Sequence, residues 1–127
     1  MLPGTFAVHR WSSNQPFPAA GLGKIYPAVL AIIHTRYMED LTAEALSQEV
    51  FITPQYLSRL FSRYLGCSVY EYLTKFRLSK AKELLVSNRG RRIQDIAQDV
   101  GYTDASHFVV MFRKITGMAP SEFRRIN

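Results

Sequence analysis

Cysteine is almost absent from this chain of 127 residues, which has only Cys67. One thiol cannot form a disulfide within the chain or build a zinc site by itself, so a disulfide-stapled secreted scaffold and a zinc finger are both excluded. Long apolar runs are lacking too. The longest, Pro27 to Ile33, falls far short of the roughly 20 residues that span a bilayer, and no signal-peptide pattern opens the chain. We therefore expect a soluble, cytoplasmic protein.

Signatures of catalysis and of ligand binding are also lacking. The sequence shows no nucleophile with an accompanying base, no paired carboxylates of a cleft and no glycine-rich phosphate loop. His9 and His34 have no Cys, Asp or Glu at metal-ligand spacing. We expect no enzyme activity, no cofactor and no metal.

Positive charge, in contrast, is abundant and concentrated in the second half of the chain. The net charge is +6, and the isoelectric point is near 9.7. Residues 1–58 carry three basic and four acidic side chains, whereas residues 59–127 carry 13 basic and 6 acidic ones. This excess favours an acidic partner, with nucleic acid ahead of an anionic membrane surface.

The spacing of apolar residues predicts an all-α fold of about seven helices. Residues 1–23 contain several Pro and Gly without an apolar period, which is typical of a flexible linker or tail. Thr42, Thr53 with Pro54, Ser68 with Glu71, and Thr103 mark helix starts, and glycines mark helix ends. The predicted helices cover residues 25–39, 43–50, 54–65, 68–86, 93–100, 104–116 and 120–125.

The two halves of the chain resemble each other. Residues 46–53 match residues 96–103 at an offset of 50, and residues 57–72 match residues 108–123 at an offset of 51. Each copy reads as a short helix, a tight turn and a longer helix, which is the helix-turn-helix pattern. Small residues, Ser47 and Ala97, stand at the expected helix crossings, and Gly101 permits a tight turn, although its counterpart is Phe51.

The longer helix of each copy leaves one face free to enter a DNA major groove, which is just wide enough for a helix. We predict base contacts from the exposed positions of this face: Gln55, Ser58, Arg59, Ser106, Val109 and Val110. We predict phosphate contacts from flanking polar and basic positions: Thr53, Ser62, Arg63, Thr103, Arg113 and Lys114. His107 is interpreted as a structural residue, and Cys67 as a partly buried small hydrophobe.

Three stretches carry a resemblance to a known family. They are residues 56–61 (YLSRLF), residues 77–85 of the long helix, and residues 96–124, which end in Gly117-x-x-Pro120-x-Glu122-Phe123-Arg124. With these stretches the sequence resembles, over residues 24–126, the DNA-binding domain of the AraC/XylS family of bacterial transcription regulators. The resemblance implies a helix-turn-helix subdomain over 24–67, a linking helix over 68–87 and a second subdomain over 88–127, with two recognition helices in successive major grooves.

Three positions depart from the family pattern. The family usually has polar side chains where Val109 and Val110 stand, and Ser or Thr where Ala119 precedes Pro120. Valine senses only shape or a thymine methyl group, so helix 54–65 is expected to set most of the sequence specificity.

Other interpretations of the sequence stay open at this point. The basic helices also suit an acidic protein partner such as an RNA polymerase subunit, and a domain of this kind can target a longer enzyme to DNA. The resemblance implies that polymerase contact accompanies DNA binding. We expect this domain to be a monomer that forms the C-terminal part of a longer regulator, in which another domain would support a dimer. A free-standing small regulator of similar length is the alternative.

Overall fold

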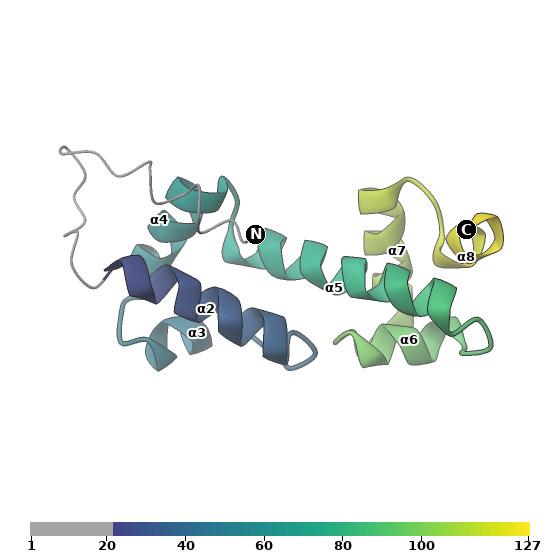
Figure 1. Ribbon diagram of the computed structural model, residues 1–127, viewed down its shortest axis with the longest axis horizontal. Coiled ribbons are helices and arrows are strands. Elements are labelled where there is room, and N and C mark those ends of the chain that lie inside the picture. Colours follow the sequence, from purple (N-terminus) through teal and green to yellow (C-terminus); the bar gives the residue numbers. More distant parts are fainter. Residues whose placement is uncertain (1–21) are drawn as a thin grey trace. The chain divides into compact units, whose positions relative to one another are not determined.

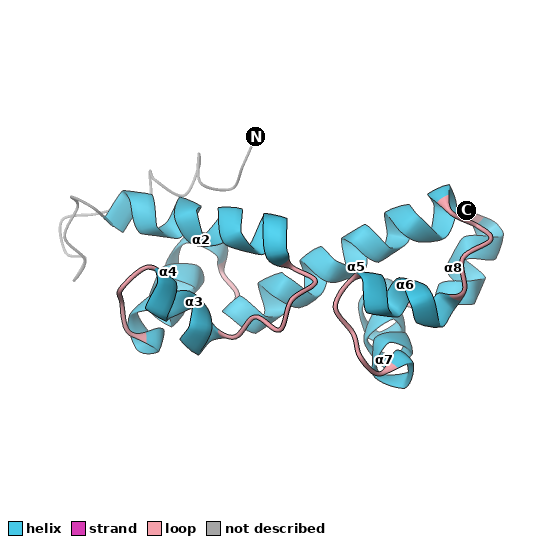
Figure 2. Ribbon diagram, turned by 90° about the horizontal axis from the view of Figure 1, so that it is seen from below, coloured by secondary structure: helices cyan, strands magenta, loops and turns pink. Residues whose placement is uncertain are grey.

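The structure, a computed structural model, describes residues 22–127, with side chains described from Ile25 onward. Within this range the regular structure is entirely helical, which confirms the all-α prediction (Figures 1 and 2). The helices are α2 (Leu22–Arg36), α3 (Ala43–Glu49), α4 (Pro54–Leu65), α5 (Val69–Ser87), α6 (Ile93–Asp99), α7 (Ala105–Thr116) and α8 (Pro120–Ile126).

The described residues form two compact units. Unit 1 contains residues 22–36 and 41–72, and unit 2 contains residues 37–40 and 73–127. The boundary between them falls inside α5, and the short segment after α2 packs in unit 2. Each unit contains one short helix followed by a turn and a longer helix: α3 with α4 in unit 1, and α6 with α7 in unit 2.

Unit 1 is organised around the apolar stripe of α4. The members of this stripe, Leu57, Leu60, Phe61 and Tyr64, are all buried. The ring of Tyr64 stacks on that of Tyr26 from α2, with 4.8 Å between the ring centroids. Burying this face stabilises the unit far more than helix propensity alone, because isolated helices of this length are marginal in water.

Local hydrogen bonds fix the helix ends of unit 1 where the sequence predicts them. The Thr42 hydroxyl accepts from the Ala45 backbone N–H at 3.0 Å, and the Thr53 hydroxyl accepts from that of Tyr56 at 3.1 Å. Gly66 ends α4 in the left-handed conformation, with φ of +71°. The start of α5 is the predicted capping box, in which Ser68 and Glu71 exchange two hydrogen bonds of 3.0 Å.

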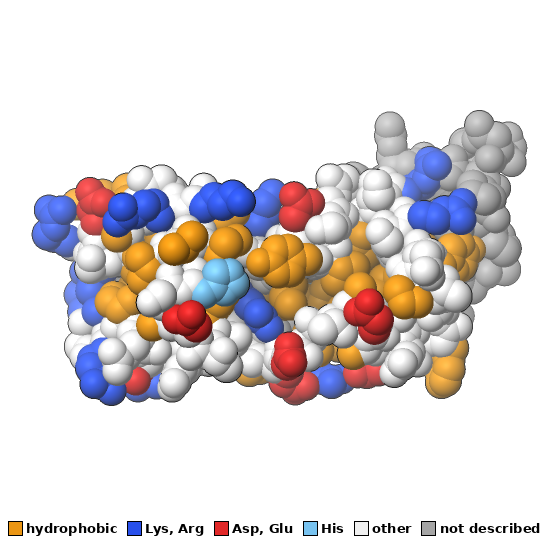
Figure 3. Space-filling view, turned by 180° about the vertical axis from the view of Figure 1, so that it is seen from behind, with side chains coloured by type: hydrophobic (Ala, Val, Ile, Leu, Met, Phe, Trp, Pro, Cys, Tyr) orange, Lys and Arg blue, Asp and Glu red, His pale blue; other side chains and the backbone are white. Residues whose placement is uncertain are grey.

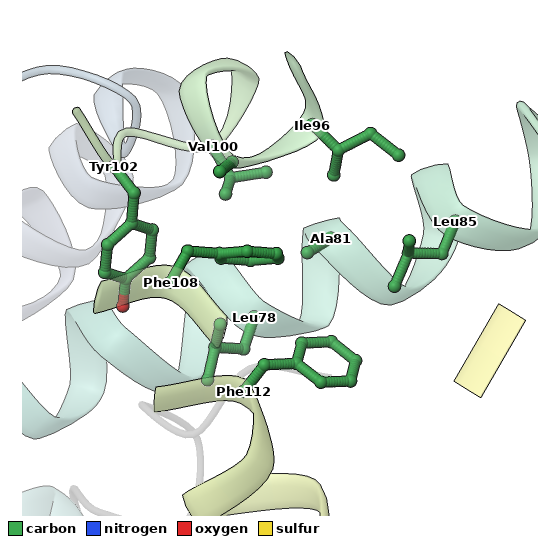
Figure 4. Packing of buried hydrophobic residues seen from close by; sticks show 9 residues of the cluster. Leu78, Ala81, Leu85, Ile96, Val100, Tyr102, Phe108 and Phe112 are labelled. Carbon is green, nitrogen blue, oxygen red and sulfur yellow. The ribbon is translucent and has the colours of Figure 1, made fainter. Parts of the chain in front are cut away.

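Unit 2 is built around the aromatic side chains of α7. Figure 4 shows Phe108 and Phe112 facing Leu78 and Ala81 of α5, and all four residues are buried. The α6 side of this core is supplied by Ile96, Ala97 and Val100, and the turn adds Tyr102. Since α7 contributes two large rings to the core, its orientation in the unit is set by packing on α5 and α6.

Both ends of the first helix, predicted over residues 25–39, and the predicted start of α7 are wrong. The first helix begins at Leu22 and ends at Arg36, so Pro27 lies inside it rather than in its first turn, and the predicted tail extends two residues too far. The start of α7 is capped by Asp104, whose carboxylate accepts from the Ser106 backbone N–H at 2.9 Å, and not by Thr103. The rest of the predicted tail, including His9, lies outside the described residues.

In the described part of the chain, no helix has both the length and the apolar character needed to cross a bilayer.

Candidate nucleic-acid interface

Each helix-turn-helix is closed by a short backbone hydrogen bond across its turn. In unit 1 the Ile52 N–H donates to the Ser47 carbonyl at 3.0 Å, and in unit 2 the Tyr102 N–H donates to the Ala97 carbonyl at 2.8 Å. Ser47 and Ala97 are both buried, as expected of small residues where two helices cross. The two copies therefore share one backbone plan, in agreement with the repeat in the sequence.

The residue that reverses the chain differs between the two turns. Gly101 has φ of +106°, a conformation that glycine adopts without strain. Phe51 occupies the equivalent place with φ of +61°, and its side chain is 94% exposed. The turn geometry is thus conserved between the copies even where the residue type is unfavourable for it.

The first recognition helix, α4, presents a polar and basic surface. All five predicted DNA-contacting residues within α4 are exposed: Gln55, Ser58, Arg59, Ser62 and Arg63. Thr53, also predicted to contact DNA, is exposed at the N-terminus of α4, where its hydroxyl caps the helix. An accepting hydroxyl oxygen still has its own proton to donate, so capping and phosphate contact are compatible.

The second recognition helix, α7, presents a more apolar surface. Ser106, Arg113 and Lys114 are exposed, and Val110 is 60% exposed. Val109 is only half-buried and packs against the core of unit 2, so Val110 is the more accessible of the two predicted valines. Thr103 is exposed in the turn before α7. Figure 3 shows one face of the molecule, on which hydrophobic side chains (orange) lie exposed among basic (blue) and acidic (red) ones.

Charge is divided between the helices of each copy in the same way. The recognition helices each carry two basic residues and no acidic residue: Arg59 and Arg63 in α4, and Arg113 and Lys114 in α7. The helices that precede them each carry two acidic residues and no basic residue: Glu44 and Glu49 in α3, and Asp95 and Asp99 in α6. This partition gives each recognition helix the sign of charge that attracts phosphates.

Arginines outside the recognition helices pair with most of these acids. Arg36 donates to both carboxylate oxygens of Glu49 at 3.0 Å, and Arg91 donates to both oxygens of Asp99 at 2.7 and 2.8 Å. The hydrogen bonds from Arg91 lower the pKa of the Asp99 carboxyl, and Arg92 lowers the pKa of Asp95 in the same way. These carboxylates are therefore charged and engaged at neutral pH.

The structure adds two residues that the sequence analysis did not assign to this surface. Asp104 is the α7 cap, and its signal was present, since Asp is a favoured cap residue directly before Ala105. His107 is exposed on α7 and meets the edge of Tyr102 at 5.5 Å between ring centroids. The sequence did not show this exposure, because His107 directly precedes Phe108, which is buried and sets the apolar period of α7 together with Phe112.

Comparisons with known proteins give a consistent result. A family model described as a helix-turn-helix domain matches residues 46–126. The chain is 37% identical over 101 residues to the uncharacterized HTH-type transcriptional regulator YijO of Escherichia coli K12, covering 80% of this chain and 35% of that protein. It is 39% identical over 92 residues to the lactose operon transcription activator of Staphylococcus xylosus, covering 72% of this chain and 33% of that protein.

A solved structure matches nearly the whole chain. The C-terminal domain of AraT, a response regulator from Geobacillus stearothermophilus, is 33% identical, with a TM-score of 0.79 over 91% of this chain and 89% of that one. The present chain spans only about a third of the length of the two curated relatives.

Proposed function

Starting from the fact that this chain belongs to the AraC-type helix-turn-helix family of transcription regulators, we propose that it binds double-stranded DNA through α4 and α7 in successive major grooves. The chain is a DNA-binding domain of a transcription regulator. The observation that supports two-groove binding is the repeat itself, in which each copy carries an exposed recognition helix with two basic residues and no acidic one. The first reader would be formed by residues 24–67, the linking helix by residues 68–87, and the second reader by residues 88–127.

In this proposal α4 reads base edges by hydrogen bonding. Arg59 donates two hydrogen bonds to a guanine edge, and Gln55, one turn earlier on the same exposed face, pairs with adenine. Ser58 accepts or donates beside them. Thr53, Ser62 and Arg63 lie where the helix would run beside phosphates, and these contacts fix its register without reading sequence.

The second reader, α7, contributes more affinity than specificity. Val110 lacks hydrogen-bonding side-chain atoms, so it senses only groove shape or a thymine methyl group. Val109, half-buried, contributes less, and Ser106 supplies one polar contact. Arg113, Lys114 and Thr103 bind phosphates. The expected binding site therefore has a sharply defined half under α4 and a loosely defined, T-containing half under α7.

We further propose that this domain binds DNA as a monomer and works by binding rather than by catalysis. The relatives described above carry names of transcription regulators, which supports a role in regulating transcription. A regulator of this kind acts in the cytoplasm, and contact with RNA polymerase would accompany DNA binding. Dimerisation would then belong to another domain of a longer protein.

Selection of duplexes from a random DNA pool by the purified chain tests this function. A site with two half-sites about one helical turn apart supports it. If roughly 5 to 8 phosphates are neutralised, log affinity against log salt has a slope of about −4 to −7. A footprint confined to one groove segment, or affinity independent of salt, would contradict the proposal. Two equally sharp half-sites would contradict only the division of labour between α4 and α7.

A further inference from the structure

Arg77 of α5 makes contacts within unit 2 that connect three separate stretches of sequence. Its Nε donates to the Tyr37 carbonyl at 2.7 Å, and its Nη2 donates to the Glu39 carbonyl at 2.6 Å. Its guanidinium also lies over the Tyr102 ring, 5.7 Å from the centroid. Tyr37 itself packs against the core of unit 2 and meets Phe76 edge to face at 5.3 Å. One side chain thus binds the segment after α2 and the turn before α7.

The turn before α7 is shaped to receive this guanidinium. A Cβ atom on Gly101 would lie 2.8 Å from Arg77 Nε and 2.9 Å from its Cζ, which is closer than real Cβ contacts allow. Gly66 and Gly117 also have positive φ, but a Cβ on either would meet nothing within 4 Å. The absence of a side chain at Gly101 therefore serves two purposes: the left-handed backbone and the close approach of Arg77.

From this geometry we propose that Arg77 is a positioning residue for DNA binding. It holds the Gly101–Tyr102 turn, and so fixes how α7 is presented to its half-site, without touching DNA itself. The inference rests on the proposed function, because it concerns the reading of DNA by α7. Tyr102 transmits the constraint, since its ring is buried beside Phe108, the first core residue of α7, at 5.5 Å between centroids.

The chemistry of the contact requires arginine rather than a generic cation. Two carbonyl oxygens two residues apart accept from two different nitrogens of one planar group, an arrangement that a lysine ammonium on a flexible stem does not reproduce. The guanidinium also lies over the Tyr102 ring, where a cation is attracted to the ring face, while its nitrogens donate to the two carbonyls. Arg77→Lys is therefore expected to keep the charge and lose the function.

The first arm of the test measures the contact by a double-mutant cycle on stability. Gly101→Ala in the wild-type background adds backbone strain and displaces Arg77, whereas in an Arg77→Ala background it adds strain alone. The folding equilibrium constant should fall about tenfold less in the second background, as expected for hydrogen bonds from a charged donor. Gly117→Ala, with positive φ and open space, is the control and should cost the same in both. Equal costs of Gly101→Ala in both backgrounds would overturn the contact.

The second arm measures DNA reading with the duplex selected by the wild-type chain. The half-site that loses definition with Arg59→Ala belongs to α4, and the other belongs to α7. Arg77→Ala should weaken binding about tenfold on the intact duplex, with the same loss when the α4 half-site is scrambled and almost none on a duplex that ends before the α7 half-site and so offers α7 neither bases nor phosphates. Arg77→Lys should behave similarly, and it substitutes for Arg77→Ala if that variant is unfolded. Lys75→Ala, which removes an exposed charge from the same helix, is the matched control.

The outcomes separate the inference from the proposed function. A purely structural role for Arg77 would reduce binding to all three duplexes by one common factor, which would overturn the inference while leaving DNA binding intact. An equal loss in Arg77→Ala and Lys75→Ala, with rescue by Arg77→Lys, would show a simple effect of charge and also overturn it. A wild-type chain that selects no duplex would overturn the proposed function and the inference together.

Discussion

Replacing Phe51 by glycine is expected to stabilise the protein, although it removes a large aromatic side chain. An L-residue in the left-handed region costs about 1–2 kcal/mol, and Phe51 is held there with φ of +61°. Glycine removes this strain but loses more backbone entropy on folding, about 0.5–1 kcal/mol. Because the Phe51 side chain is 94% exposed, almost no packing is lost. The net gain is about 0.5–1 kcal/mol.

Thermal unfolding followed by far-ultraviolet circular dichroism measures this gain. For a chain of 127 residues, 1 kcal/mol corresponds to a rise in Tm of about 4 °C. Phe51→Ala is the matched control, because it removes the ring and keeps an L-residue at the same φ, so its Tm should stay near that of the wild type. A Phe51→Gly variant no more stable than Phe51→Ala would refute the strain argument and show that the turn relaxes at no cost.

Three further predictions concern other parts of the chain. Ala119→Ser should stabilise α8 by about 1 kcal/mol and raise Tm, because Ala119 has the backbone of a cap but no side-chain hydrogen bond. Serine at this position would complete a capping box with Glu122. The control Ser121→Ala should leave Tm unchanged. Arg59→Ala should cost about 1–3 kcal/mol of binding on the selected duplex and relax one base position, whereas equal weakening on every sequence would make Arg59 a phosphate contact. Since Arg91 lowers the folded-state pKa of Asp99, the stabilisation from this pair is present above the ordinary carboxyl pKa of about 3.9 and is lost as the pH falls through the lower folded value. The urea midpoint should therefore drop less on acidification in Asp99→Asn than in the wild type.

Most helix ends were predictable because their signals are local. The cap formed by Thr53 with Pro54, the Ser68–Glu71 box and the left-handed Gly66 and Gly117 each depend on residues within one or two turns of the chain. The start of α2 was not predictable in this way. A proline is expected in a first turn, yet Pro27 lies inside α2, where the buried neighbours Tyr26 and Val29 hold the helix through tertiary packing.

The exposed face of the candidate site was predictable from the sequence, but the contacts that hold its helices in place were not. The period of α4 separates buried Leu57 and Leu60 from exposed Ser58 and Arg59, so the exposed face proposed to read DNA follows from the sequence. The role proposed for Arg77 does not follow from the sequence. Its hydrogen-bond acceptors are backbone carbonyls about 40 residues away, and a backbone carbonyl carries no residue-type signal. The half-burial of Val109 was missed for a related reason, since it depends on how α7 packs in unit 2.

The two copies of the helix-turn-helix separate the residues that build the domain from those proposed to read DNA. At equivalent positions the buried side chains keep their character, as with Phe61 and Phe112, whereas the exposed ones diverge, as with Arg59 and Val110. Buried residues set where a recognition helix lies, and substitutions on its exposed face change stability little. Each reader can therefore acquire its own sequence preference, or lose one, while its helix stays in place. The division of labour proposed for α4 and α7 depends on that separation.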